Sequence, residues 1–374
     1  MIASNNLQNL SPDELIKSVI QRIATGPEMS KDISRDEAKQ CMASVLKGEI
    51  DETRSAIFLI ALRMKRETDD EFLGIHDAIK EVTNTVQISQ NNVINIGDPY
   101  DGFTRNIPSS AFLLPVLAEL GYSVLSHGVN CIGPKFGCTH NITFELLGLN
   151  VNMSTEKAAE RLENSKIGWA YLDQSQFCPN LYSLINLREK IIKRPVITTV
   201  EVLANPIVGN KTHFVTGYVH KGYPPIYLNL SRNAGFDTAM VIRGTEGGVI
   251  PSLKQNGKVY FYKTKNSKDE LLEIDPINDL DIHQNARAVE IPTNFSKLNT
   301  TDKVETKINP KELAAESVKL GLEALSGKDG PMKDCIIYGS SLILHNITNE
   351  DLSTCRKIVK EVVESGSCLK RVKK

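Results

Sequence analysis

The residue types that could bind a phosphate group are concentrated between Asn95 and Gly148. Two glycine-containing loops there each follow a short apolar run: Gly97–Gly102 includes Asp98 and Asp101, and His127–Gly128 ends the second run. Glycine lets backbone N–H groups approach an anion, and a helix N-terminus behind the loop adds positive potential. The pattern predicts a phosphate-facing site. A plain strand-to-helix turn at the first loop, and a structural role for His127, are the competing interpretations.

Outside these loops, the residues give few further indications of chemistry. No Ser/His/Asp, Cys/His or P-loop arrangement stands out, so the sequence identifies no catalytic residue. Glu246 lies in the glycine-rich segment GTEGG, where a metal or sugar contact is well placed, but one carboxylate alone is a weak Mg²⁺ site. The seven cysteines form no CxxC pair, and Cys131 and Cys138 match no common zinc spacing. We expect free thiols in a reducing cytosol.

The order of predicted elements divides the chain in two. Helical periodicity and capping signals, such as Ser34 and Glu37 at capping-box spacing, predict four short helices in residues 1–87. Short β-rich runs then alternate with helices through residues 88–374. The predicted fold class is α/β, with a small N-terminal helical-bundle domain and a larger domain whose central, mostly parallel sheet is flanked by helices.

Three segments of the larger domain carry specific expectations. Pro195–Leu203 (PVITTVEVL) is predicted to be a strand, because β-branched residues dominate it. Lys263–Asp302 is polar and irregular, and is either a long excursion or a pair of short elements. The C-terminal residues 365–374 (SGSCLKRVKK) are expected to be a frayed or lightly packed basic tail.

Composition limits the class of protein. The 374 residues are 41% hydrophobic and 24% charged, as in a soluble globular protein with a sizeable core. The net charge of −1 gives no global electrostatic attraction to nucleic acid, although a local basic face is compatible with it. No apolar run approaches the roughly 20 residues of a membrane-spanning helix, and the N-terminus has no signal-peptide core. We therefore expect a cytoplasmic protein without membrane contact.

A series of motifs occurs in the order of a known family. A helical segment, KGEIDETRSAIFLIALRMKRETDDEFLGIHDAI, precedes a strand and a glycine/aspartate loop, and NIPSS, LSHG, PKFG and ITFELLG follow. REKIIKRPVITTVEVLANP, GYVHKGY and IRGTEGG extend the match to about Gly248. The chain resembles the anthranilate phosphoribosyltransferases, which have the type III fold of glycosyltransferase family 3, and it resembles a divergent member.

The resemblance implies a function and partners. Such enzymes transfer a phosphoribosyl group from phosphoribosyl pyrophosphate to an aromatic amine, use Mg²⁺, and form homodimers through the helical domain. The implied ligand is phosphoribosyl pyrophosphate or a related phosphorylated compound. The implied substrate-binding residues are Gly97, Asp98, Asp101, Gly102, Asn106, Ser109, His127, Gly128, Lys135, Gly137 and Arg188, and the implied metal ligands are Ser109 and Glu246.

The motifs also depart from the family's pattern. The glycine pair of the first loop is lost, and Pro99 removes a backbone N–H there. Pro108 replaces a hydroxyl residue, which Ser109 or Ser110 would have to supply. Ser126 stands where the family has lysine, and only Glu246 remains of an acidic pair. Arg188 falls at the anthranilate-contacting position, but its helix also bears Glu189, Lys190 and Lys193, so a solvated charged face is the competing interpretation.

Two functions therefore remain open from the sequence. The first is a phosphoribosyltransferase of the anthranilate type with an altered donor or acceptor. The second is a non-catalytic protein on the same fold that binds single-stranded nucleic acid. Basic groups at Arg188, Lys190, Lys193, Arg194 and the C-terminal tail motivate the second.

Overall fold

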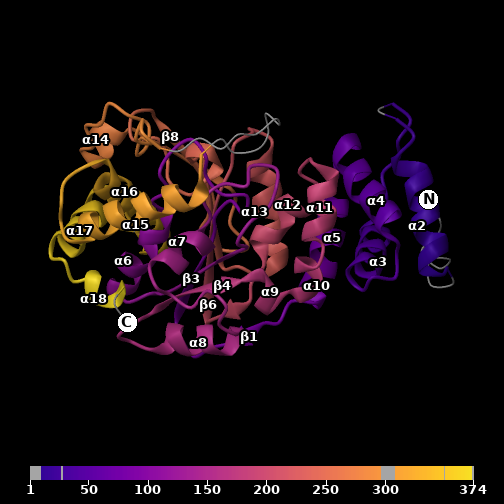
Figure 1. Ribbon diagram of the computed structural model, residues 1–374, viewed down its shortest axis with the longest axis horizontal. Helices are drawn as coiled ribbons and strands as arrows, with labels where there is room; N and C mark the ends of the chain where they lie inside the picture. Colours follow the sequence, from indigo (N-terminus) through magenta and orange to yellow (C-terminus); the bar gives the residue numbers. More distant parts are fainter. Residues whose placement is uncertain (1–9, 27, 296–307, 349, 373–374) are drawn as a thin grey trace.

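The computed structural model describes residues 10–26, 28–295, 308–348 and 350–372. A bundle of helices lies at one end of the molecule, and a sheet covered by helices fills the rest (Figure 1). The predicted fold class is confirmed. In the described part of the chain, no helix is both long and apolar enough to cross a membrane.

Four capped helices form the bundle. Their first residues follow Ser11, Ser34, Asp51 and Thr68, each of which accepts a hydrogen bond from a backbone N–H of the first turn. The predicted capping box of Ser34 and Glu37 is present. The helices are α2 (Pro12–Ile23), α3 (Arg35–Leu46), α4 (Glu52–Lys65) and α5 (Asp69–Glu81).

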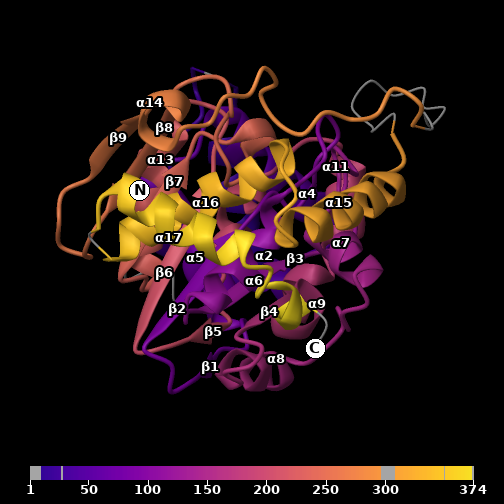
Figure 2. The same cartoon turned by 90° about the vertical axis from the view of Figure 1, so that its left-hand side faces the viewer.

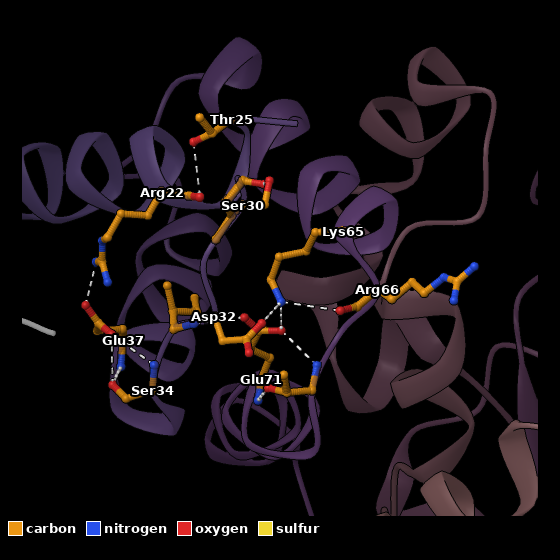
Figure 3. A network of polar contacts seen from close by, with 12 residues as sticks. Arg22, Thr25, Ser30, Asp32, Ser34, Glu37, Lys65, Arg66 and Glu71 are labelled. Carbon is orange, nitrogen blue, oxygen red and sulfur yellow. Dashed lines mark hydrogen bonds and ion pairs between the residues drawn. The ribbon is translucent and has the colours of Figure 1, made fainter. Parts of the chain in front are cut away.

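A network of ion pairs and hydrogen bonds, in which the side chains of Lys65 and Glu71 are buried and that of Asp32 is exposed, joins these helices (Figure 3). Lys65 Nζ lies 2.7 Å from Glu71 Oε2 and 2.6 Å from Asp32 Oδ1, and Glu71 also accepts the backbone N–H of Ile33 at 3.0 Å. Burial opposes the charge of Lys65, but its hydrogen bonds to Asp32 and Glu71 raise its pKa above the usual value. The link between α2 and α3 is thereby fixed to α4 and α5.

The central sheet has seven strands in the order β4-β3-β2-β6-β7-β8-β9. The first five strands are parallel to one another, and the pairings of β7 with β8 and of β8 with β9 are antiparallel. The strands are β2 (Asn92–Gly97), β3 (Ser123–Gly128), β4 (Trp169–Asp173), β6 (Lys211–Gly217), β7 (Thr238–Ile242), β8 (Gly257–Tyr262) and β9 (Glu270–Ile274). A separate parallel pair is formed by β1 (Val86–Gln87) and β5 (Ile207–Val208).

Side chains alternate between the two faces of the sheet, as the period of a strand requires. In β7, Ala239 and Val241 belong to the core shared with the bundle, whereas Met240 and Ile242 belong to the core beneath the C-terminal helices. Figure 2 shows α16 and α17 in front of the strands. Both faces are therefore buried, which explains the nearly continuous apolar runs of the parallel strands.

The remaining helices cover the sheet and its loops. Between the parallel strands lie η1 (Ser110–Phe112), α6 (Leu113–Glu119), α7 (His140–Leu146), α8 (Thr155–Glu163), α9 (Gln174–Phe177), α10 (Pro179–Tyr182), α11 (Ile185–Ile191), α12 (Ile197–Val200), η2 (Glu201–Leu203) and α13 (Tyr223–Ala234). After β7 come η3 (Thr245–Gly247), α14 (Pro276–Leu280), α15 (Pro310–Leu325), α16 (Pro331–Thr348), α17 (Leu352–Glu364) and α18 (Leu369–Val372).

Three local expectations need correction or completion. The predicted strand at Pro195–Leu203 is wrong: the segment forms α12 and η2, because packing against the bundle core overrides its β-propensity. The segment from Lys263 contains a pair of short elements, β9 and α14, and its last residues, 296–302, lie outside the described part of the chain. The expectation of a lightly packed tail is wrong for its described residues, 365–372, since Cys368 is buried and Arg371 pairs with Glu119; residues 373–374 lie outside the described part.

Candidate functional site

The strand order reverses at the carboxyl ends of β2 and β6, the place where an open α/β sheet has its ligand crevice. From β2 the chain proceeds outward to β3 and β4, then returns to β6 on the other side and continues to β7. Ligands of open α/β sheets bind outside the strand ends at such a switch point. The loops after β2, β3 and β7 all converge here, and the predicted phosphate loops are among them.

Asp98, the first residue after β2, is the centre of a buried hydrogen-bond network. Its Oδ2 accepts the Ser110 hydroxyl at 2.6 Å and lies 3.0 Å from His140 Nε2, while Oδ1 accepts the Val249 N–H at 3.2 Å. The Ser126 hydroxyl contacts the other ring nitrogen of His140 at 2.7 Å. Asp98 thus joins the β2 loop to α7 and to the turn after β7.

Asp101 and two cations form the more accessible part of the site. Lys135 Nζ lies 3.3 Å from Asp101 Oδ1 and 3.9 Å from Glu246 Oε2. Arg194 binds the other oxygen of Asp101, with Nε at 3.1 Å. The side chain of Arg194 is about half exposed, so a ligand anion could reach it from solvent.

Glu246 closes the site from the β7 side. Its carboxylate accepts the backbone N–H groups of Thr104 at 3.1 Å and Arg105 at 2.6 Å. Glu246 has a φ of 53°, which is unusual for a residue other than glycine and orients this carboxylate toward the β2 loop.

Glycines allow the three loops to touch. Gly102 has a φ of +73°, and a Cβ there would lie 2.6 Å from the carbonyl oxygen of Cys138. A Cβ on Gly217, at the end of β6, would lie 2.1 Å from the carbonyl oxygen of Gly247. Backbone therefore occupies the base of the crevice, and only glycine fits at these contacts.

His127 lies beneath the crevice and is not accessible. It is 2% exposed, shares a hydrogen bond with the Tyr100 hydroxyl, and packs edge-on against Phe177. Burial, assisted by the nearby His140, lowers the pKa of His127 to about 3, so its ring is neutral at neutral pH. The neighbouring Gly128 is buried at the same strand end.

Arg188 is also buried, and its charge is paired inside the protein. Its guanidinium binds Glu201 in a two-pronged ion pair, with Nη2–Oε1 at 2.6 Å and Nη1–Oε2 at 2.7 Å. Both side chains are buried, so the solvated-face interpretation of Arg188 is wrong. In this arrangement, an anionic acceptor would have to compete with Glu201 for the guanidinium.

The predicted site residues fall into three groups. The loops bring together Gly97, Asp98, Asp101, Gly102, Lys135, Gly137 and Glu246. Asn106 and Ser109 are buried, and Ser109 interacts with the Cys335 thiol of α16, whose pKa burial raises to about 12. His127, Gly128 and Arg188 lie inside the protein.

Sequence reasoning missed two polar residues of the site, His140 and Glu201. It named Ser110 only as an alternative to Ser109, and Arg194 only as a basic group for nucleic acid. Glu201 could have been found from the sequence, because a single carboxylate within the apolar run VITTVEVL needs a buried partner. Nothing in the local pattern distinguishes Ser110 from Ser109.

The carboxylates do not form a ready metal site. Asp98, Asp101 and Glu246 each have hydrogen-bonded or cationic partners, and among the residues that the structure describes no group of three or more His, Cys, Asp or Glu could hold a metal ion. Ser109 and Glu246, the predicted metal ligands, contact different parts of the chain. The protein residues do not fit a preformed Mg²⁺ site.

Comparison with known proteins gives independent information. Residues 17–82 match the family description "Glycosyl transferase family, helical bundle domain". An uncharacterized protein of Aquifex aeolicus is 28% identical over 64% of this chain and 71% of its own length. The anthranilate phosphoribosyltransferase of Polynucleobacter necessarius is 23% identical over 97% of both chains.

Solved structures agree on the fold. The anthranilate phosphoribosyltransferase of Saccharomyces cerevisiae, in complex with PRPP and Mg, superposes with a TM-score of 0.72 at 15% identity and covers 96% of both chains. The bundle, the sheet and the loops at its switch point define an α/β protein built to bind a ligand at the strand ends. The helical bundle matches the bundle domain of the glycosyl transferase family, and the whole chain is similar, at low identity, to anthranilate phosphoribosyltransferases.

Proposed function

We propose that the protein is a phosphoribosyltransferase of the anthranilate type, which transfers a phosphoribosyl group from phosphoribosyl pyrophosphate to a nitrogen acceptor. The main support is that the loops after β2, β3 and β7 converge at the switch point of the sheet. Lys135 and Arg194 are the cations in the accessible part of this site, where both contact Asp101. Full-length similarity to anthranilate phosphoribosyltransferases supports the same reaction class.

In the proposed reaction, the bond from the sugar C1 to the pyrophosphate oxygen breaks and a C1–N bond forms. The pyrophosphate leaves with the electron pair, and the acceptor nitrogen loses a proton. Lys135 and Arg194 would exchange Asp101 for phosphate oxygens, since a guanidinium or ammonium binds phosphate through charge-assisted hydrogen bonds. The chain offers positioning and charge rather than an acid–base pair.

Two expectations about ligands are part of this proposal. The Saccharomyces cerevisiae structure contains Mg with PRPP. In this protein Mg²⁺ would be held chiefly by the phosphates of the donor, because Mg²⁺ is commonly bound by substrate phosphates with few carboxylates. The proposed acceptor is an amine that binds without a contact to Arg188, because the guanidinium of Arg188 is already paired with Glu201. A cytoplasmic homodimer paired through the bundle completes the proposal.

The decisive experiment is a thermal-melting assay of the purified chain with phosphoribosyl pyrophosphate and Mg²⁺, followed by detection of released pyrophosphate with anthranilate and other aromatic amines. We expect Mg²⁺-dependent stabilisation by the donor. Lys135→Met should weaken it at least about tenfold, whereas Lys268→Met, at an exposed site, should not. Absence of a shift at millimolar donor would refute the proposal.

Nucleic-acid binding is the less supported alternative. Of the basic residues that motivated it, Arg188 is buried, Lys190 pairs with Glu52 at 2.6 Å, and Arg371 of the tail pairs with Glu119. Lys193 and Arg194 remain exposed beside the crevice. Binding of a single-stranded oligonucleotide that weakens steeply with salt, without donor stabilisation, would favour this function instead.

A further inference from the structure

A cavity opens beside the turn that carries Glu246. It has a volume of about 450 Å³ and lies at the carboxyl end of β7 and the start of β8. It is lined by Arg243–Thr245, by Ser252, Gln255 and Asn256, and by Arg287. Its volume is within the range of about 300–1,000 Å³ typical of small-molecule sites.

The lining is polar and carries charge of one sign. Arg243 and Arg287, both exposed, line the cavity, and none of the described lining residues is a carboxylate. Within the described ranges of the chain, neither arginine has an ion pair, in contrast to Arg188 and Arg194. Glu246 belongs to the adjoining turn, but its carboxylate is bound to the backbone at Thr104 and Arg105. The cavity is therefore electropositive without internal compensation.

Backbone hydrogen bonds fix the positions from which both arginines project. The Arg243 N–H donates to the Lys258 carbonyl of β8 at 2.9 Å. The Arg287 carbonyl accepts the Leu253 N–H at 2.9 Å, which ties the segment after α14 to the turn after β7. Although the two arginines are distant in sequence, the folded backbone holds them on one cavity.

Ser252 supplies a hydroxyl donor between them. It is buried, and its Oγ accepts the N–H groups of Lys254 at 3.3 Å and Gln255 at 3.2 Å. Because these bonds use the oxygen as an acceptor, the hydroxyl hydrogen is left to donate to a ligand. The side-chain amides of Gln255 and Asn256 add further donors.

We propose that this cavity binds the phosphate group of a small phosphorylated molecule. Two planar guanidinium groups match the oxygens of a tetrahedral phosphate in forked contacts, and the hydroxyl and amides supply neutral donors. The cavity exceeds the size of the anion alone, so it accommodates an attached organic group. This site is separate from the crevice that contains Lys135 and Asp101 and does not depend on transferase activity.

The test is titration calorimetry of the full chain with inorganic phosphate and with ribose 5-phosphate. We expect Arg243→Gln and Arg287→Gln each to weaken binding at least about tenfold. Lys254→Gln is the matched control: it removes an exposed positive charge next to the cavity but outside its lining, and should change affinity less than about threefold.

Two outcomes would overturn the proposal. One is binding by both arginine variants that equals the unaltered protein or the Lys254→Gln control. The other is loss of phosphate binding in Lys135→Met together with its retention in Arg243→Gln, which would place the anion in the crevice. If the transferase assay fails but phosphate binding is retained and still depends on Arg243, the proposed function is wrong and this site is supported.

Discussion

Arg188 and Glu201 form a buried two-pronged ion pair between α11 and η2, at the position where the family resemblance suggested an acceptor contact. Gln174 Nε2 lies 3.3 Å from the same carboxylate, and the Thr198 hydroxyl lies 3.3 Å from the guanidinium. Removal of one partner leaves an uncompensated buried charge, which is more costly than the loss of an exposed pair.

Arg188→Ala should therefore lower the free energy of unfolding by about 3–5 kcal/mol, measured by urea titration. Lys190→Ala, in the same helix, breaks only the exposed pair with Glu52 and should cost at most about 1 kcal/mol. Replacement of both buried partners in Arg188→Met/Glu201→Leu should recover most of the loss. If Arg188→Ala is as stable as Lys190→Ala, the buried pair does not form.

The close contact of the loops at Gly102 gives a second prediction. Gly102 and Gly121 both have positive φ, +73° and +92°, so alanine carries a similar backbone strain of about 1–2 kcal/mol at either position. A Cβ on Gly102 meets the Cys138 carbonyl, whereas nothing lies within 4 Å of a Cβ on Gly121.

Gly102→Ala should thus be less stable than Gly121→Ala by about 1–3 kcal/mol, and it alone should reduce stabilisation by phosphoribosyl pyrophosphate. Thermal unfolding with and without the donor measures both effects. Equal losses in the two variants would mean that the β2 and β3 loops do not touch at this point.

The sequence is a good guide to the sheet because its strands are short apolar runs bounded by glycine or polar residues, as at β2 and β7. It is a poor guide to the partners within the site. Arg188 and Glu201 are 13 residues apart, and only the helical path of Pro195–Leu203 brings them together.

The choice between adjacent hydroxyls could not be predicted either. Ser110 reaches Asp98, while Ser109 faces Cys335, because the turn of η1 directs neighbouring side chains to different sides. His140 was overlooked for a related reason: it begins α7, 42 residues after Asp98, and becomes a partner only when two loops converge. Such pairings depend on tertiary structure rather than on local pattern.

Buried histidines predict how stability depends on pH. Burial lowers the pKa of His213 to about 4, against 6.5 for an exposed histidine. Between these values the unfolded chain binds a proton and the folded chain does not, so the free energy of unfolding falls as the pH is lowered from about 6.5 to 4. Each such histidine contributes up to about 1.4 kcal/mol per pH unit.

His213→Gln should make the free energy of unfolding depend less steeply on pH. An amide can replace the contacts of His213 to Thr238 and Asn92, and it does not titrate. Urea unfolding at pH 7, 6 and 5 measures the slope. An unchanged slope in His213→Gln would contradict a proton-free buried ring.

We expect the proposed dimer to form through the outer face of α4, which carries exposed apolar side chains. Ile57 and Met64 lie seven residues apart on one face and are 38% and 73% exposed. Met64→Glu should convert the dimer to monomer in size-exclusion chromatography with light scattering, because a buried unpaired carboxylate costs several kcal/mol. Ile277→Glu, on the exposed face of α14 at the other end of the molecule (Figure 1), should remain dimeric. A dimer that survives Met64→Glu, or an unaltered protein that is monomeric at micromolar concentration, would exclude pairing through this face.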